Sequence, residues 1–333
     1  MSPLSDTTAG ARAAGPVVSV LIPAYDAIAT LDEAVRSVFA QTFPDWEVVI
    51  ADDGSTDGSL ELGWSWMARE SRVRLVRHPA GAHLGRPATR NLAVREARGE
   101  IVAFLDADDE LLAESLASYV AAFEHFPRCG VIYGQALAWR AGKPAEAMGR
   151  GVPGAEVRLL RQLARFNVLV TSATAVRRRV LTEESFPLEM TLSQDWACWV
   201  RLAQQWRYVF LPVVLSHYRI HPDSGTERMR AAGGETGWER AQVLFLHRVL
   251  RSAAGDDARD LRAGLRYRAT SFLRRGISLA RHGRWREASL WLALAREAAP
   301  SLSALVLAAL AVAPEQIRIW RGIDPSLAIA ETP

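Results

Sequence analysis

The first 105 residues alternate short apolar runs with segments whose apolar residues recur at helical spacing. The apolar runs are rich in Val, Ile and Leu, as in strands buried on both faces, and lie at 17–22, 46–51, 73–76 and 101–105. Helical segments lie between them at 30–40 and 60–70, and a third begins near Pro87. Thr30 and Glu33 are expected to form a capping box for the first helix. The pattern predicts an α/β fold with a doubly wound, mainly parallel sheet flanked by helices.

The second half of the chain changes character twice. From residue 131 the signals are mixed, and they predict helices and strands at 157–166, 170–176, 195–204 and 208–215. The polar, glycine-bearing segment 223–237 is expected to be a loop, either a domain boundary or a lid. After Trp238 the apolar residues recur only at helical spacing. We therefore predict a disordered tail at 1–15, an α/β domain at 16–230 and an all-α appendage at 238–325.

Composition narrows the classes of protein. The 333 residues are 49% hydrophobic and 23% charged, so most of the chain should fold, and the net charge of +3 does not indicate a nucleic-acid binder. Lys143 is the only lysine, which disfavours lysine-dependent and P-loop chemistry. Cys129 and Cys198 have no metal or redox spacing and suggest a reducing compartment. Residues 1–14 do not resemble a signal peptide, and the apolar stretch 302–313 is too short to span a bilayer, so we expect a cytoplasmic protein.

The fourth apolar run ends abruptly in clustered carboxylates. Asp106, Asp108 and Asp109 follow it directly, and burying several like charges is costly unless a cation lies between them. Hard oxygen ligands at a strand end suit Mg²⁺ or Mn²⁺, and such a cation would in turn bind a diphosphate. The alternative is that Asp108 or Asp109 caps a helix over 111–126.

Further polar residues fall near other predicted strand ends, where ligands of doubly wound sheets bind. Asp52 and Asp53 follow the second strand, and one of them is available to accept a hydrogen bond from a base edge, unless the pair forms an ordinary Asx turn. Gly85 permits close approach of a ligand, and Arg86 and Arg90 are suited to neutralising phosphate. The alternative for both arginines is an exposed surface position.

Two later residues are candidates for chemistry. Asp195 opens an apolar helix beside Trp196 and Trp199, where it is either a general base or an N-cap. His221 follows a strand in the run Tyr-Arg-Ile-His-Pro, where it is either a metal or phosphate ligand or a structural histidine.

Five ordered motifs together resemble the family 2 glycosyltransferases, which have the GT-A fold. The resemblance covers residues 17–224 and is carried by VSVLIPAYDAIATLDEAVRSVFAQTF (18–43), VVIADDGSTDGS (48–59), GRPATRNLAVREARGEIVAFLDADDE (85–110), SQDWACWVRLA (193–203) and YRIHPDSGT (218–226). The chain departs from the family pattern at Asp26, where Asn is usual, and at Gln194, where Glu is common.

The resemblance implies an inverting transfer of a sugar from a nucleoside-diphosphate sugar, for which a UDP-linked donor is expected, to a hydroxyl of a glycan or lipid-linked glycan. Tyr25 and Asp53 would contact the uridine, and Asp106 the ribose or metal. Asp108 and His221 would hold Mg²⁺ or Mn²⁺, and Asp195 would be the general base. The remaining donor-binding residues that it implies are Pro23, Gly85, Arg86 and Arg90, while segments 131–135 and 171–174 would influence the choice of sugar.

Competing classes remain open at this point. A receiver domain needs a lysine near its acidic residues, and a sugar nucleotidyltransferase generally carries a glycine-rich basic signature after the first strand, which is absent at 23–30. A non-catalytic binding protein is a third alternative. The C-terminal arginines and Trp285 would suit either an anionic membrane surface at the inner face of the membrane or a solvated helical face.

Overall fold

The computed structural model describes residues 15–140, 145–222, 224–232 and 234–302. The chain divides into two compact units. One contains the chain up to Arg158 with Val168–Cys198 and Gln205–His221, and the other contains Leu159–Asn167, Trp199–Gln204 and the chain from Pro222 onward. The predicted tail up to residue 14, Lys143 and the apolar stretch beyond residue 302 lie outside the described residues. The domain boundaries at 16–230 and 238–325 stay predictions.

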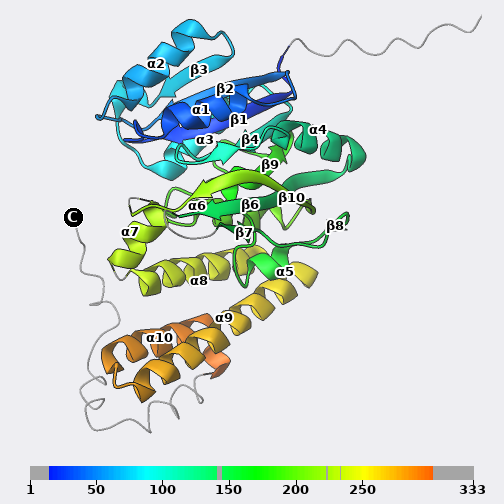
Figure 1. The fold of residues 1–333 in the computed structure, drawn as a ribbon. Helices are drawn as coiled ribbons and strands as arrows, with labels where there is room; N and C mark the ends of the chain where they lie inside the picture. The colour runs from blue at the N-terminus through cyan, green and yellow to red at the C-terminus, as the bar shows by residue number, and fades with distance from the viewer. Residues whose placement is uncertain (1–14, 141–144, 223, 233, 303–333) are drawn as a thin grey trace, which may run out of the picture. The chain divides into compact units, whose positions relative to one another are not determined.

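The first unit is built on a mixed sheet of ten strands in the order β3-β2-β1-β4-β9-β6-β10-β5, with β7 beside β6 and β8 beside β10 (Figure 1). The strands are β1 (Val18–Ala24), β2 (Trp46–Asp52), β3 (Val73–Arg77), β4 (Ile101–Phe104), β5 (Glu110–Leu111), β6 (Cys129–Trp139), β7 (Glu146–Met148), β8 (Glu156–Val157), β9 (Thr174–Arg177) and β10 (Arg207–Arg219).

The half of the sheet from β3 to β4 is wholly parallel, as the alternation of strands and helices predicts. Beyond β4, the strand β9 runs antiparallel to both of its neighbours, β4 and β6, whereas β6 and β10 pair in parallel. The predicted α/β class is confirmed, and the sheet as a whole is mixed. Because two successive antiparallel pairings restore the original direction, β4 and β6 both end at the same edge of the sheet.

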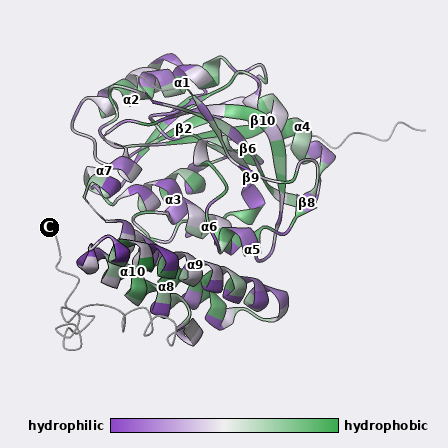
Figure 2. Ribbon diagram, turned by 60° about the horizontal axis from the view of Figure 1, so that its bottom comes forward, coloured by the Kyte–Doolittle hydropathy of each residue, from purple (hydrophilic) through white to green (hydrophobic). Residues whose placement is uncertain are grey.

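Helices and apolar strand residues enclose the core of this unit. The helices are α1 (Leu31–Phe39), α2 (Ser59–Arg69), α3 (Arg86–Glu96), α4 (Ser115–His125) and the start of α6 (Gln194–Leu202), with 3₁₀ turns η1 (Pro79–Gly81), η2 (Thr171–Ala173) and η3 (Arg178–Val180). Every residue of β2 is buried, and α3 packs against β1 and β2. Figure 2 shows predominantly hydrophobic strands and helices that carry both colours, as amphipathic helices should.

Several local expectations for this unit are wrong. The helix predicted over 111–126 begins only at Ser115, because Glu110–Leu111 pair with β10 as strand β5, so Asp108 and Asp109 cap no helix. Thr30 precedes α1 but makes no side-chain capping bond. The strand predicted at 170–176 begins as the turn η2 and becomes extended at Thr174. At Glu110–Leu111, tertiary pairing overrides the local helix preference.

The second unit is helical. It contains α5 (Leu160–Leu163), α7 (Gly225–Ala231), α8 (Glu235–Ser252), α9 (Gly255–Arg281), α10 (Trp285–Ala298) and η4 (Pro300–Leu302). The all-α C-terminal region is confirmed, but the predicted loop at 223–237 contains helix α7, and the helix predicted at 157–166 is reduced to α5. Residues 223 and 233 lie outside the description.

The arginines of the C-terminal helices are partly engaged within this unit. Arg275 pairs with Glu235 at 2.6 Å and lies over the ring of Trp291 at 4.2 Å, and Arg284 pairs with Glu287 at 2.5 Å. These contacts are typical of a solvated, ion-paired helical face. None of the described helices combines the length and the apolar character needed to span a lipid bilayer.

Candidate active site

The parallel strands β1, β2 and β4 deliver their carboxyl ends to one edge of the sheet, where the candidate residues gather. Tyr25 follows β1, Asp53 follows β2, and Asp106 lies just beyond β4. The amide of Asp53 donates to the carbonyl of Ala24 at 2.9 Å, which fixes the first two loops against each other. The strand order therefore brings together residues that are separated by up to 81 positions in the chain, from Tyr25 to Asp106.

Asp53 organises the loop that precedes helix α3. It is 3% exposed, and its carboxylate accepts hydrogen bonds from the amides of Leu84 at 2.8 Å and Gly85 at 3.0 Å. Gly85 has φ +87°, a conformation that a residue with a side chain adopts only at a cost. Gly85 therefore allows the backbone to turn toward Asp53 and then into α3.

An aromatic pair stands beside this loop. Tyr25 is 47% exposed, and its ring lies 4.1 Å, centroid to centroid, from that of His83. The Nδ1 atom of His83 lies 3.1 Å from the Asp53 carboxylate. The sequence reasoning missed His83, although its place between two glycines in a loop after a strand is a signal that could have found it. The exposed ring faces suit stacking on a flat ligand.

The two aspartates at the end of β2 have different partners. The Asp52 carboxylate accepts hydrogen bonds from the amides of Gly54 at 3.1 Å and Ser55 at 3.3 Å. Asp52 therefore forms the Asx turn that the sequence offered as the alternative to a ligand contact. Asp26, the residue that departs from the family pattern, accepts from the amide of Thr56 at 2.8 Å. Asp26 therefore stabilises the neighbouring turn, and only Asp53 of the Asp-Asp pair reaches the glycine loop.

The acidic loop after β4 gathers carboxylates at one point. Asp106, Asp108 and Asp109 can each place one oxygen so that all three oxygens lie within 4.8 Å of one another. The Nε2 atom of His221 lies 3.0 Å from Asp108 Oδ2, so the end of β10 contributes to the same place. Burial, together with the charges of Asp108 and Asp106, raises the pKa of Asp109 well above its ordinary value. A hard divalent cation would relieve this repulsion, so the donor set fits Mg²⁺ or Mn²⁺.

Arg90 is the cationic partner of this loop. It is 3% exposed, so the surface alternative is wrong for this arginine, and its guanidinium donates to Asp106. Although burial opposes ionisation, the charges of Arg90 and Arg86 hold the pKa of Asp106 below its ordinary value. Arg86 is itself exposed at the start of α3. When the Gln194 amide is oriented to satisfy both of its ends, its oxygen accepts from Arg90 at 2.7 Å.

Asp195 lies in the first turn of α6, inside the helix rather than at its N-cap. Its Oδ2 accepts a hydrogen bond from the hydroxyl of Thr171 at 3.0 Å. Burial opposes the positive charge of Arg90. The negative charges of Asp106 and, to a smaller extent, Asp195 outweigh this effect and raise the pKa of Arg90, so both carboxylates lie within electrostatic reach of it. Arg90 thus links the acidic loop electrostatically to the candidate base.

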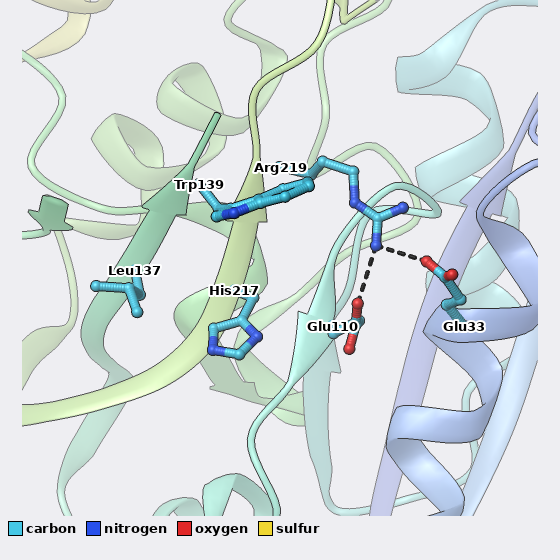
Figure 3. A pocket seen from close by; sticks show the side chains of 6 residues that line it. All are labelled: Glu33, Glu110, Leu137, Trp139, His217 and Arg219. Carbon is cyan, nitrogen blue, oxygen red and sulfur yellow. Dashed lines mark hydrogen bonds and ion pairs between the residues drawn. The ribbon is translucent and has the colours of Figure 1, made fainter. Parts of the chain in front are cut away.

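A separate cavity of about 320 Å³ opens beside the acidic loop in the same unit. Arg219 lies between Glu33 and Glu110, which it contacts at 2.6 and 2.9 Å (Figure 3). Trp139 and His217 line the rest of it, with Leu137. The amide of Arg219 donates to Asp109 at 2.9 Å, so this triad also supports the acidic loop.

Known proteins with similar sequences indicate the family of this chain. The sequence profile of glycosyl transferase family 2 matches residues 19–186. A UDP-Glc:alpha-D-GlcNAc-diphosphoundecaprenol beta-1,3-glucosyltransferase of Escherichia coli is 32% identical over 109 residues, which are 32% of this chain and 40% of that protein. An uncharacterized Sinorhizobium fredii protein is 36% identical over 121 residues, 36% of this chain and only 13% of that relative.

Two solved structures have a similar fold. TarS 1–349 of S. aureus in complex with UDP-GlcNAc gives a TM-score of 0.63 at 21% identity and covers 88% of this chain and 87% of that one. The mannosyltransferase PcManGT of Pyrobaculum calidifontis, in complex with GDP-Man and Mn²⁺, gives a TM-score of 0.56 at 22% identity, covering 92% and 84%.

The mixed sheet, with its acidic loop after β4, has the GT-A fold of these two structures. The chain belongs to glycosyl transferase family 2.

Proposed function

We propose that the protein transfers a sugar, with inversion, from a UDP-linked donor to a hydroxyl of a glycan or lipid-linked glycan. One observation carries the proposal: the adjacent residues Thr171 and Ser172 donate hydrogen bonds to Asp195 of α6 and to Asp109 of the acidic loop, at 3.0 and 2.5 Å. The carboxylates suited to a metal and the carboxylate suited to a base therefore belong to one site, as transfer between two bound substrates requires.

The donor nucleotide would bind at the ends of β1 and β2. Tyr25 would stack on the uracil, and His83 behind it would hold the tyrosine ring in place. Asp53 would contact the base while it orders the Gly85 loop. Pro23, at the end of β1, and Gly85, which has no side chain, would leave room for the donor nucleotide.

Asp108 and His221 would hold the Mg²⁺ or Mn²⁺ ion, with Asp106 directed to the ion or to the ribose. When bound, this ion would neutralise the charge that develops on the departing diphosphate. Arg86, exposed at the N-terminus of α3, is placed to contact phosphate directly. Arg90, already paired with Asp106, would act on the site through that carboxylate.

Asp195 would remove the proton of the acceptor hydroxyl as the oxygen attacks the anomeric carbon of the sugar. Because attack comes from the face opposite to the leaving diphosphate, the configuration at that carbon inverts. The bond from the anomeric carbon to the diphosphate oxygen breaks as the new glycosidic bond forms, and the proton remains on Asp195 until solvent removes it.

The acceptor class is inferred from relatives. The E. coli relative, by its name, uses UDP-Glc and a diphosphoundecaprenol-linked sugar, and the TarS complex contains UDP-GlcNAc. We therefore place the protein in polysaccharide biosynthesis in the cytoplasm, at the inner face of the membrane when the acceptor is lipid-linked. In this proposal 16–230 form the catalytic domain, and the helices of 238–325 include the arginines that would contact an anionic surface.

A thermal-shift screen of UDP, GDP and their sugar derivatives, with and without Mn²⁺, tests the proposal. We expect a UDP-sugar to raise Tm more with Mn²⁺ than without it, and to be hydrolysed slowly to UDP and free sugar. Release of pyrophosphate would favour a nucleotidyltransferase, and binding without any turnover would favour a non-catalytic protein. If no nucleotide raises Tm, the result would contradict all three functions: glycosyltransferase, nucleotidyltransferase and non-catalytic nucleotide-sugar-binding protein.

A further inference from the structure

Two adjacent hydroxyls hold the two chemically different parts of the site. Thr171 and Ser172 stand side by side in turn η2, and the first bonds to Asp195 while the second bonds to the acidic loop. We propose that this pair positions the metal-binding loop and the general base relative to each other. The inference rests on the proposed function and assigns roles to two residues that do not themselves touch the reacting atoms.

Ser172 clamps the acidic loop at both ends. Its side chain is completely buried, its Oγ donates to Asp109 Oδ2 at 2.5 Å, and the same oxygen accepts from the amide of Asp106 at 3.1 Å. Inside the loop, the Asp109 amide donates to the carbonyl of Asp106 at 3.0 Å. A hydroxyl has only one proton to donate, so it is committed to Asp109. Ser172 therefore fixes both carboxylate-bearing ends of the loop in one geometry.

Thr171 fixes the orientation of the base. It is 6% exposed, and its hydroxyl donates to one oxygen of Asp195. Within the part of the chain that the structure describes, the Asp195 side chain has no second hydrogen bond. Its other oxygen therefore stays available for an acceptor hydroxyl, and the carboxylate plane is set by Thr171.

The turn that carries both hydroxyls is anchored to the middle of the sheet. The amide of Ala173 and the hydroxyl of Thr174 both donate to the carbonyl of Val170, at 3.0 and 2.8 Å. Thr174 then begins β9, which pairs with both β4 and β6. Because β4 leads directly into the acidic loop, the turn and the loop are supported by neighbouring strands, and sites held by strands are more precise than sites held by loops alone.

The Ser172 role is tested by binding of Mn²⁺ alone, followed by electron paramagnetic resonance, and of UDP with Mn²⁺, followed by calorimetry. Loss of a residue that orients metal ligands typically weakens metal affinity, so Ser172→Ala should lower Mn²⁺ affinity by about tenfold or more. Thr174→Val is the matched control, because it removes a buried hydroxyl of the same segment that donates to the backbone carbonyl of Val170 rather than to a carboxylate. It should lower Tm and leave Mn²⁺ affinity within about twofold.

Equal Mn²⁺ affinity in the wild type and Ser172→Ala overturns the inference, as does an equal loss in both variants. If Ser172→Ala does not fold, Ser172→Cys retains a side chain of similar shape with a weaker donor. It should still lose Mn²⁺ affinity relative to Thr174→Val, and wild-type affinity in the cysteine variant also overturns the inference.

The Thr171 role is tested by separating turnover from binding, with the UDP-sugar that the screen identifies. Thr171→Val should bind UDP and Mn²⁺ as the wild type does and turn over about tenfold more slowly or worse at saturating donor. Thr171→Ser, which keeps the hydroxyl, should recover most of the rate. A serine variant as slow as the valine variant, or a valine variant at the wild-type rate, contradicts the assignment.

Failure of this inference is distinguishable from failure of the proposed function. A wild type that binds no UDP in the presence of Mn²⁺ removes the proposed function, whereas Mn²⁺ binding by itself still reports on Ser172. A wild type that binds and turns over normally beside unaffected Ser172 and Thr171 variants removes only the positioning role.

Discussion

The Nε2 atom of His221 lies 3.0 Å from Oδ2 of Asp108, across 113 positions of sequence. The contact joins the loop after β4 to the residue that follows β10 by two positions. Neither side chain is fully buried, so both are accessible to an incoming cation. In the proposed function, this carboxylate and imidazole would supply two of the six ligands of an octahedral Mg²⁺ or Mn²⁺ ion.

We predict that Asp108→Ala and His221→Ala each abolish most of the gain in UDP affinity that Mn²⁺ provides. Loss of a residue that only orients a metal ligand typically lowers metal affinity tenfold or more. Loss of a ligand itself should therefore lower metal affinity by at least about tenfold. Calorimetry with Mn²⁺ and with EDTA measures the gain. His282→Ala is the control, since this exposed histidine lies in the helical unit and its Nδ1 is 2.8 Å from the carbonyl of Ser278. Unchanged affinity in both site variants would remove the metal assignment.

Asp195→Asn should abolish transfer while UDP binding survives. The amide retains the shape of the carboxylate but is too weak a base to accept the acceptor proton, and general bases typically contribute about 10²- to 10⁴-fold. Transfer rate and UDP affinity are measured on the same preparation. Asp256→Asn makes the same change in the first turn of α9 and should leave the transfer rate unaltered. Loss of binding together with rate would indicate a structural role for Asp195.

Tyr25→Ala should weaken UDP binding. An aromatic platform is worth about 1–3 kcal/mol per stacked base, which corresponds to roughly five- to hundredfold in affinity. Trp64→Ala is the control, because Trp64 is 46% exposed against 47% for Tyr25 but lies on α2. His83→Ala should have a smaller effect in the same direction, since His83 supports the tyrosine ring. Equal UDP affinity in the Tyr25 and Trp64 variants would place the base elsewhere.

Substitutions of Arg86 and Arg90, both on α3, should separate an effect on folding stability from an effect on UDP binding. Arg90→Gln leaves Asp106 without its buried partner and should lower the free energy of unfolding by about 2–3 kcal/mol, below the full cost of a broken buried pair because Asp106 is 26% exposed. Arg86→Gln, at an exposed position, should change the unfolding free energy by less than about 0.5 kcal/mol. It should instead weaken UDP binding. Urea unfolding and calorimetry measure the two quantities, and a reversed pattern would contradict the roles given to them.

The local sequence is sufficient to predict an element when the residues that determine it lie close together in the chain. The apolar runs of β1 to β4 and the acidic loop at Asp106–Asp109 were predicted because burial on both faces requires uninterrupted apolar residues, and a strand end requires polar ones. It was insufficient at residues 110–114, where helix signals continue but β10 takes Glu110–Leu111 into the sheet. The same limit applies to Thr30, whose sequence fits a cap that the folded backbone does not form.

Within the site, the sequence by itself determined the family, the alternating strands and helices, and the residue types available for chemistry. Only the tertiary structure decided which of two neighbouring aspartates meets the Gly85 loop, which arginine of α3 is buried, and that Thr171 and Ser172 divide their hydroxyls between Asp195 and the acidic loop. The physical reason is distance along the chain. Propensity and periodicity act over a few residues, whereas a hydrogen bond between residues tens of positions apart depends on how the strands between them are ordered in the sheet.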